Sequence, residues 1–317
     1  MKSPTTLSSH NWRRLGALIL IMLSVYVLLP QISVFKRSLD VLAAANSWTF
    51  VVTASVFALT FLCAALTYYF LALRPIKYHR TVLVTLANMF TSRLLPAGSG
   101  GIATFYLYFR CNRYSASEAG VVVAVNNFIG MVAHVSLLLA LFMFSPVSFR
   151  GMFLGTTNLF IIIGICAIGA IAALAIFFIK ALRRRINKIV HSLVHDLKFY
   201  KRHPIRLIGA YGSSLLLTAT YVLTLLLCLA SVGETLSPLT VLMIFTIGVV
   251  AGALTPTPGG LGGTEAGLVA GLIGYHVPAN SALAAVLIFR LITYWLSFAV
   301  GAVTFVFLQR RQGYFVN

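Results

Sequence analysis

The sequence predicts an all-α polytopic integral membrane protein with six full transmembrane helices and two re-entrant helical hairpins in an inverted-topology repeat. Three observations lead to this prediction: an extremely apolar composition, long runs without charged side chains, and two breaks rich in proline and glycine. Of the 317 residues, 60% are hydrophobic and 9% are charged, whereas ordinary soluble domains are about 25% charged. A water-soluble domain is therefore excluded.

Six runs free of Asp, Glu, Lys and Arg are each long enough to span a bilayer, since about 20 apolar residues cover the hydrocarbon core. Their hydrophobicity is continuous rather than alternating, which favours helices over barrel strands. Two further apolar regions are interrupted in the middle by proline and glycine. The six runs are 15–35, 41–73, 119–149, 151–179, 207–233 and 291–309, and the interrupted regions are 81–109 and 239–275.

Basic residues predict the orientation, because Lys and Arg in short loops are retained on the cytoplasmic side. If both 81–109 and 239–275 are re-entrant hairpins, 19 basic residues fall on one side and 3 on the other. We therefore expect both termini in the cytoplasm and the protein in the cell (inner) membrane. The chain, 1–317, then forms one membrane domain with inverted halves 15–145 and 151–309, a pattern typical of transporters that bind substrate near the midplane.

The segment 180–203 places apolar residues at helical spacing among its Lys and Arg residues. This pattern predicts a basic amphipathic helix on the cytoplasmic surface, attracted to anionic headgroups. The net charge of +19 does not indicate nucleic acid, because the cations are spread over short segments between apolar runs. We expect membrane phospholipids as partners, and a homo-oligomer stays open.

The second break, LTPTPGGLGG at 254–263, predicts a helix that begins inside the membrane. Its prolines end the incoming helix, its glycines allow close and left-handed backbone, and Thr264 can cap the outgoing helix. A helix start of this kind carries about half a positive charge and binds anions. The first break, RLLPAGSGG at 93–101, predicts a second helix start of the same kind.

Ionisable side chains at membrane depth are costly, so each one requires a partner or a function. Arg93 lies before the first break, Glu265 follows the second, and Arg290 lies about one third into the last span, taken as 281–308. We interpret the arginines as phosphate ligands and Glu265 as a structural counter-charge, a gate or a proton acceptor. The predicted substrate-binding residues are Arg93, Ser99, Gly100, Gly101, Gly259, Gly260, Gly262, Gly263, Thr264, Glu265, Arg290 and Tyr294.

Three motifs together resemble the transmembrane region of lysylphosphatidylglycerol synthases: PTPGGLGGTE at 256–265, RLLPAGSGG at 93–101 and RLITYW at 290–295. The resemblance covers nearly the whole chain. It implies a flippase-type lipid transporter, because members joined to the synthase are implied to flip aminoacylated phosphatidylglycerol. We expect a stand-alone member without the soluble aminoacyltransferase domain, since the chain ends at Asn317. The residues after Gly101 depart from the family pattern, in which a carboxylate and an arginine often follow.

These observations together predict a lipid flippase or transporter. It would move a phospholipid, either aminoacyl-phosphatidylglycerol or another anionic or zwitterionic lipid, between leaflets. The alternatives are a membrane-embedded transferase or accessory subunit acting on a lipid-linked substrate, and a small-anion carrier. With 5 carboxylates in the chain and no spacing that assembles an acid pair, a metal cluster or an activated nucleophile, we expect no enzyme, no metal and no cofactor.

Overall fold

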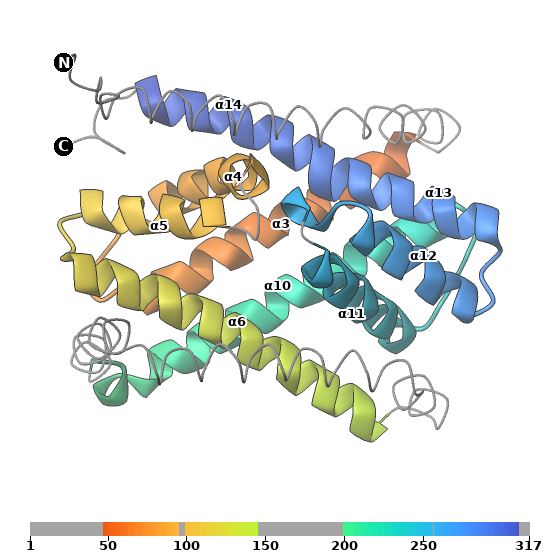
Figure 1. Ribbon diagram of the computed structural model, residues 1–317, viewed down its shortest axis with the longest axis horizontal. Coiled ribbons are helices and arrows are strands. Elements are labelled where there is room, and N and C mark those ends of the chain that lie inside the picture. Colours follow the sequence, from red (N-terminus) through yellow and green to blue (C-terminus); the bar gives the residue numbers. More distant parts are fainter. Residues whose placement is uncertain (1–46, 95–98, 145–198, 256, 311–317) are drawn as a thin grey trace, which may run out of the picture. The chain divides into compact units, whose positions relative to one another are not determined.

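The computed structural model describes residues 47–94, 99–144, 199–255 and 257–310, and all regular secondary structure within them is helical (Figure 1). In chain order the elements are α3 (Ser47–Leu71), α4 (Tyr78–Leu94), α5 (Ser99–Cys111), α6 (Ala116–Phe144), α10 (Pro204–Ser231), α11 (Pro238–Leu254), the 3-10 turn η2 (Pro258–Gly260), α12 (Gly263–Gly274), α13 (Ala279–Arg290), the π-helical segment η3 (Leu291–Leu296) and α14 (Ser297–Arg310).

Four of these helical stretches are long and apolar enough to cross a membrane: Trp48–Leu71, Ala116–Leu141, Pro204–Ser231 and Ala279–Arg310. They coincide with four of the six predicted spans, so the chain is an α-helical polytopic membrane protein. The predicted spans 15–35 and 151–179 lie outside the described residues, as does most of the predicted amphipathic helix 180–203. The count of six spans therefore stays a prediction.

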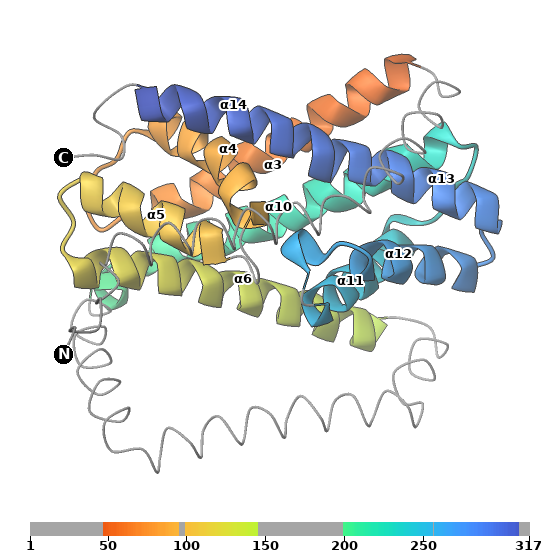
Figure 2. The same ribbon diagram turned by 45° about the horizontal axis from the view of Figure 1, so that its top comes forward.

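The last span differs from the charge-free run 291–309. Its helix begins at Ala279 and continues through Arg290, so that α13, η3 and α14 form one rod (Figure 2). An arginine is tolerated within the helix because Glu265 neutralises it. The helix therefore extends beyond the charge-free run and agrees with the span taken as 281–308.

Both predicted breaks separate helices. The first falls between α4 and α5, although residues 95–98 lie outside the described part. The second separates α11 from α12, which pack side by side (Figures 1 and 2). Re-entry through one membrane face and the inverted repeat stay predictions.

The described residues belong to two compact units, each treated by itself. Unit 1 comprises the described residues 47–61, 83–94, 99–104, 219–255 and 257–310, and unit 2 comprises 62–82, 105–144 and 199–218.

Unit 1 is organised around the α11–α12 pair, which is held by small residues. Gly252 lies against Thr264, and Gly248 lies against Leu268, so a side chain at either glycine would collide with α12. Small residues of this kind let two helices in a membrane approach closely. The apolar cluster around the pair includes Phe57, Leu225, Leu229, Ile244, Leu268, Val286 and Phe289.

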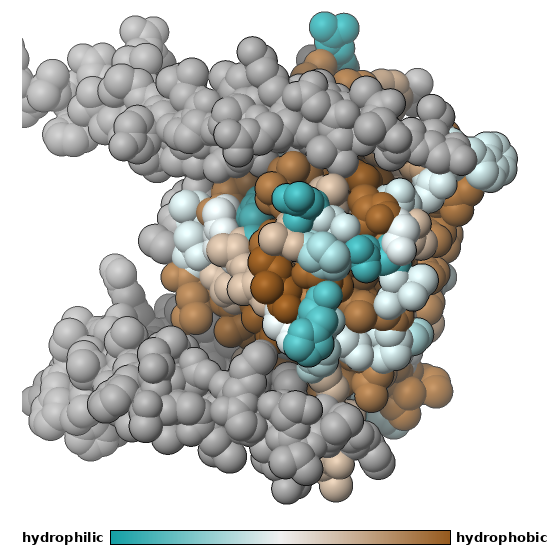
Figure 3. Space-filling model, turned by 90° about the vertical axis from the view of Figure 1, so that its right-hand side faces the viewer, coloured by the Kyte–Doolittle hydropathy of each residue, from teal (hydrophilic) through white to brown (hydrophobic). Residues whose placement is uncertain are grey.

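At the right-hand end in Figure 1, unit 1 carries two turns without Lys or Arg, 232–237 after α10 and 275–278 after α12. Figure 3 shows hydrophilic residues mixed with apolar ones on this face. The positive-inside rule assigns turns without Lys and Arg to the non-cytoplasmic side. The orientation stays a prediction.

Unit 2 has an aromatic core and a network of backbone contacts at the end of α3. The rings of Tyr68 and Phe105 stack with centroids 3.6 Å apart. The Tyr114 hydroxyl donates to the Arg74 carbonyl at 2.9 Å and accepts from the Arg74 amide at 2.8 Å. Burial raises the pKa of Tyr114, so the phenol stays protonated and can donate.

Tyr200 lies near the end of the predicted amphipathic segment and is buried in unit 2. Its hydroxyl donates to the Leu71 carbonyl at 2.6 Å. The described end of that segment is therefore anchored in the protein rather than free on a membrane surface.

Candidate substrate-binding site

The start of α12 is built from glycines in conformations that other residues rarely adopt. Gly259, Gly260 and Gly262 have φ values of 66°, 67° and 85°. Gly259 also lies so close to the Tyr294 ring that a Cβ atom would collide with it. The first helical hydrogen bond of α12 runs from the Ala266 amide to the Gly262 carbonyl at 2.9 Å. The amides of 263–265 therefore precede the helical ladder, as at every helix start.

Glu265 caps this helix start, and Thr264 does not. The Glu265 Oε2 atom accepts the Gly262 amide at 2.8 Å. The expectation that Thr264 caps the helix was wrong, because the turn of glycines shifts the cap position to Gly262 and the Thr264 side chain lies against Gly252. The carboxylate is the better cap, since its charge complements the helix dipole.

The other oxygen of Glu265 forms an ion pair with Arg290. Arg290 Nε donates to Glu265 Oε1 at 2.7 Å, and Arg290 as a whole is 7% exposed. A second nitrogen, Nη2, lies 3.5 Å from the Gly259 carbonyl oxygen. One carboxylate therefore holds both the glycine turn and the arginine of α13.

Two guanidinium groups approach the ring of Tyr294. The Cζ atoms of Arg93 and Arg290 lie 4.8 Å and 5.0 Å from the ring centroid. An aromatic ring attracts cations at such distances, more strongly where water is excluded. Tyr294 is 1% exposed, and its hydroxyl has no hydrogen-bond partner among the described residues.

Arg93 is tied to the π-helical segment. Its Nη2 donates to the Thr293 carbonyl at 2.5 Å and its Nη1 to the Met89 carbonyl at 3.2 Å. A π-helical turn shifts the backbone ladder and leaves carbonyl groups for other donors, and such turns often occur at functional sites. The Thr293 carbonyl accepts from Ser297 as well.

This group of Arg93, Glu265, Arg290 and Tyr294, here called the arginine cluster, has two cations and one carboxylate. Its formal charge is therefore +1 in a chain that spans a membrane. An unneutralised arginine inside a bilayer costs about 2.5–3.5 kcal/mol on insertion scales. The cluster is chemically suited to an anion such as a phosphate.

Most of the remaining predicted residues are glycines that let backbone segments or helices pack closely. Gly260 lies against Gly252, and Gly263 lies against Thr255. Gly100 and Gly101 lie against Thr91 and Asn88, so they let α5 approach α4 closely. Ser99 is the first residue of α5.

Sequence reasoning missed two contributors. Tyr221 of α10 lies in the neighbourhood of Arg93 and Arg290. A tyrosine inside an apolar run, away from the membrane interfaces that tyrosine prefers, was the available signal. The Thr293 carbonyl had no such signal, because nothing in the local sequence indicates a π-helical turn.

The helical spans and the partly buried arginine cluster define a polytopic membrane protein with a polar, cationic site beside its helix breaks. The chain belongs to the family described as the lysylphosphatidylglycerol synthase transmembrane region, which it matches over residues 14–301. A comparison with curated proteins found no match. Family membership relates the chain to lipid handling.

Proposed function

We propose that this protein is a lipid flippase that moves an anionic or zwitterionic phospholipid between leaflets, with the lipid phosphate bound at the arginine cluster. The observation that carries the proposal is the unequal charge, two arginines against one carboxylate around a buried tyrosine. A bound phosphate compensates the surplus charge. The family supports a lipid as the source of that phosphate.

Each residue of the cluster has a separate part in this proposal. Arg93 and Arg290 donate to phosphate oxygens, and the Tyr294 hydroxyl supplies a further donor. The phosphate competes with Glu265 for Arg290. When it binds, Glu265 keeps its hydrogen bond to the Gly262 amide, so the helix start stays capped while the ion pair opens.

The cell (inner) membrane and cytoplasmic termini belong to this proposal and are supported by the distribution of basic residues. A small-anion carrier would use the same arginines and differs only in its substrate. A membrane-embedded transferase or accessory subunit acting on a lipid-linked substrate is the other alternative.

The test is leaflet exchange of a labelled phospholipid in liposomes that contain the purified protein. Wild type should speed exchange, and Arg290→Gln should lower the rate by about tenfold or more, since a hydrogen bond to a charged group contributes about 1.5–3 kcal/mol. Glu265→Gln should also be slow, because it leaves Arg290 without its counter-charge.

Glu234→Gln is the matched control, since it makes the same change in the turn after α10. It should exchange lipid like wild type. Equal rates with and without protein would remove the proposal. Uptake of inorganic phosphate without lipid exchange would replace it with the small-anion carrier, and a covalently altered lipid would replace it with the transferase.

A further inference from the structure

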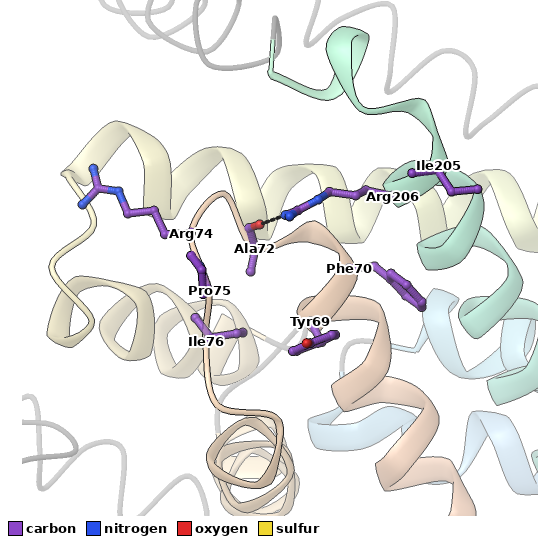
Figure 4. A pocket seen from close by; sticks show the side chains of 8 residues that line it. All are labelled: Tyr69, Phe70, Ala72, Arg74, Pro75, Ile76, Ile205 and Arg206. Atoms are coloured by element: carbon purple, nitrogen blue, oxygen red, sulfur yellow. Dashed lines mark hydrogen bonds between the residues drawn. The ribbon is translucent and has the colours of Figure 1, made fainter.

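Unit 2 contains a cavity of about 320 Å³ at the end of α3, away from the residues of the arginine cluster in the sequence (Figure 4). Its size is within the range of about 300–1,000 Å³ that is usual for small-molecule sites. The lining residues come from the end of α3, the following turn and the start of α10. They are Tyr69, Phe70, Ala72, Arg74, Pro75, Ile76, Ile205 and Arg206.

The cavity combines apolar walls with one arginine that crosses it. Figure 4 shows Arg206 reaching toward the Ala72 carbonyl, to which its Nη1 donates at 2.5 Å, above the rings of Tyr69 and Phe70. This bond occupies one N–H group of a guanidinium that carries several. Arg206 therefore retains donors for an anion.

Arg74 stands at the rim and is engaged elsewhere. Its guanidinium points away from the other lining residues in Figure 4 and forms an ion pair with Glu118 at 2.7 Å. The site therefore depends chiefly on Arg206, and Arg74 adds positive potential.

The described part of unit 2 has a large surplus of positive charge, and two of its cations, Arg74 and Arg206, line the cavity. Glu118 is its one acidic residue, against eight basic ones. The contacts of Arg74 with Arg113 and of Arg206 with Ala72 bring three basic segments to the end of α3. The basic residues are Arg74, Lys77, Arg80, Arg110, Arg113, Lys201, Arg202 and Arg206.

The apolar surface beside the cavity favours a lipid over a soluble anion. Ile205 and Ile208 are 71% and 64% exposed, and both lie on α10, which is a candidate membrane span. Exposed isoleucines of a span are suited to contact with acyl chains. A soluble phosphate would gain nothing from them.

We propose that this cavity binds the headgroup of an anionic phospholipid, with its phosphate on Arg206 and its acyl chain along Ile205 and Ile208. The site is independent of the transport proposal, because it shares no residue with the arginine cluster. Its occupant is a lipid of the surrounding leaflet.

The first experiment maps the site in the unaltered protein. Full-length protein is reconstituted in nanodiscs of phosphatidylcholine with a minor fraction of photoactivatable phosphatidylglycerol. Crosslinked peptides should include 69–76 or 205–206. Labelling confined to peptides that contain the arginine cluster, or spread evenly over the spans, would overturn the proposal.

The second experiment compares two charge-removing variants, Arg206→Gln in α10 and Arg202→Gln in the helical residues 199–202 that precede it. The first variant removes the charge of a residue that lines the cavity, whereas Arg202 is exposed and does not line it. Thermal stabilisation by short-chain phosphatidylglycerol should need about fivefold more lipid for Arg206→Gln. It should be unchanged for Arg202→Gln.

Equal weakening by both variants would show only a diffuse surface charge and would overturn the proposal. Stabilisation by inorganic phosphate that equals the effect of phosphatidylglycerol would overturn the lipid as occupant. The photochemical map decides the outcome if Arg206→Gln fails to fold.

Discussion

The arginines of the two units have opposite surroundings. In unit 1, Arg290 is almost fully buried and its carboxylate partner also caps a helix. In unit 2, the Arg74 side chain is 52% exposed, whereas the two carboxylates are alike, with Glu118 20% and Glu265 18% exposed. The two pairs share a nitrogen–oxygen distance of 2.7 Å. The same distance therefore does not imply the same contribution to stability, because the burial of the charges determines the free-energy cost of removing one partner.

The largest expected effect comes from removing the buried arginine. Arg290→Met leaves Glu265 without its partner and should lower the free energy of unfolding by about 3 kcal/mol. Arg74→Met in unit 2 should lower it by less than about 1 kcal/mol. Unfolding followed in mixed micelles measures both.

The double variant Arg290→Met, Glu265→Gln tests whether the lost stability comes from the unpaired carboxylate rather than from the missing arginine side chain. The carbonyl oxygen of the introduced glutamine can still accept the Gly262 amide, so much of the lost stability should return. Equal losses for Arg290→Met and Arg74→Met would break the comparison between the units.

The next effect concerns the packing of α11 against α12. Gly263→Ala would drive a methyl group against Thr255 and the Ala251 carbonyl, so it should cost about 1–3 kcal/mol of unfolding free energy. Gly120→Ala in α6 of unit 2 is the control, since no atom lies within 4 Å of its added Cβ. That variant should be unchanged or gain up to about 1 kcal/mol.

Thermal unfolding in one detergent compares these two glycine variants. An unchanged Gly263→Ala would contradict the close packing of α11 against α12.

A smaller effect is expected at Glu118. Its carboxylate accepts the Ser115 amide at 2.7 Å while the Ser115 hydroxyl accepts the Glu118 amide at 3.1 Å, which is a capping box at the start of α6. Glu118→Gln should cost about 1 kcal/mol, and the cost should fall as salt rises. The cost of Glu265→Gln should be less sensitive to salt, because its partner Arg290 is buried whereas Arg74 is exposed. Unfolding at low and high ionic strength measures both costs. A stronger salt dependence for Glu265→Gln than for Glu118→Gln would contradict the burial of Arg290.

The smallest effect on stability is expected for Tyr294→Phe. The ring contacts with both arginines remain, and a buried hydroxyl without a described partner is removed, so the unfolding free energy should change by less than about 1 kcal/mol. Lipid exchange should nevertheless fall several-fold, because the phosphate loses a donor. Unchanged exchange would remove the Tyr294 hydroxyl from the proposed site while leaving the arginines in it.

Much of this architecture was predictable from the sequence. The runs that became α3, α6 and α10 were visible as apolar stretches, and the breaks before α5 and α12 were visible as proline and glycine. Arg93, Glu265 and Arg290 were identifiable because ionisable residues are rare in apolar segments. The cap by Glu265 is local, three residues from Gly262, and was missed because Thr264 was taken as the cap. The approach of Tyr221 to the arginines was not visible, because it depends on contacts between helices.

The sequence by itself determined the class of the protein, the location of the helix breaks and the identity of the costly charges. These follow from composition and local backbone chemistry, which act over a few residues. The tertiary structure alone decided that Glu265 serves Gly262 and Arg290 together, that Arg93 joins them at Tyr294, and that Arg206 crosses an apolar cavity. Pairings between distant residues depend on which helices pack together, and local sequence does not encode that choice.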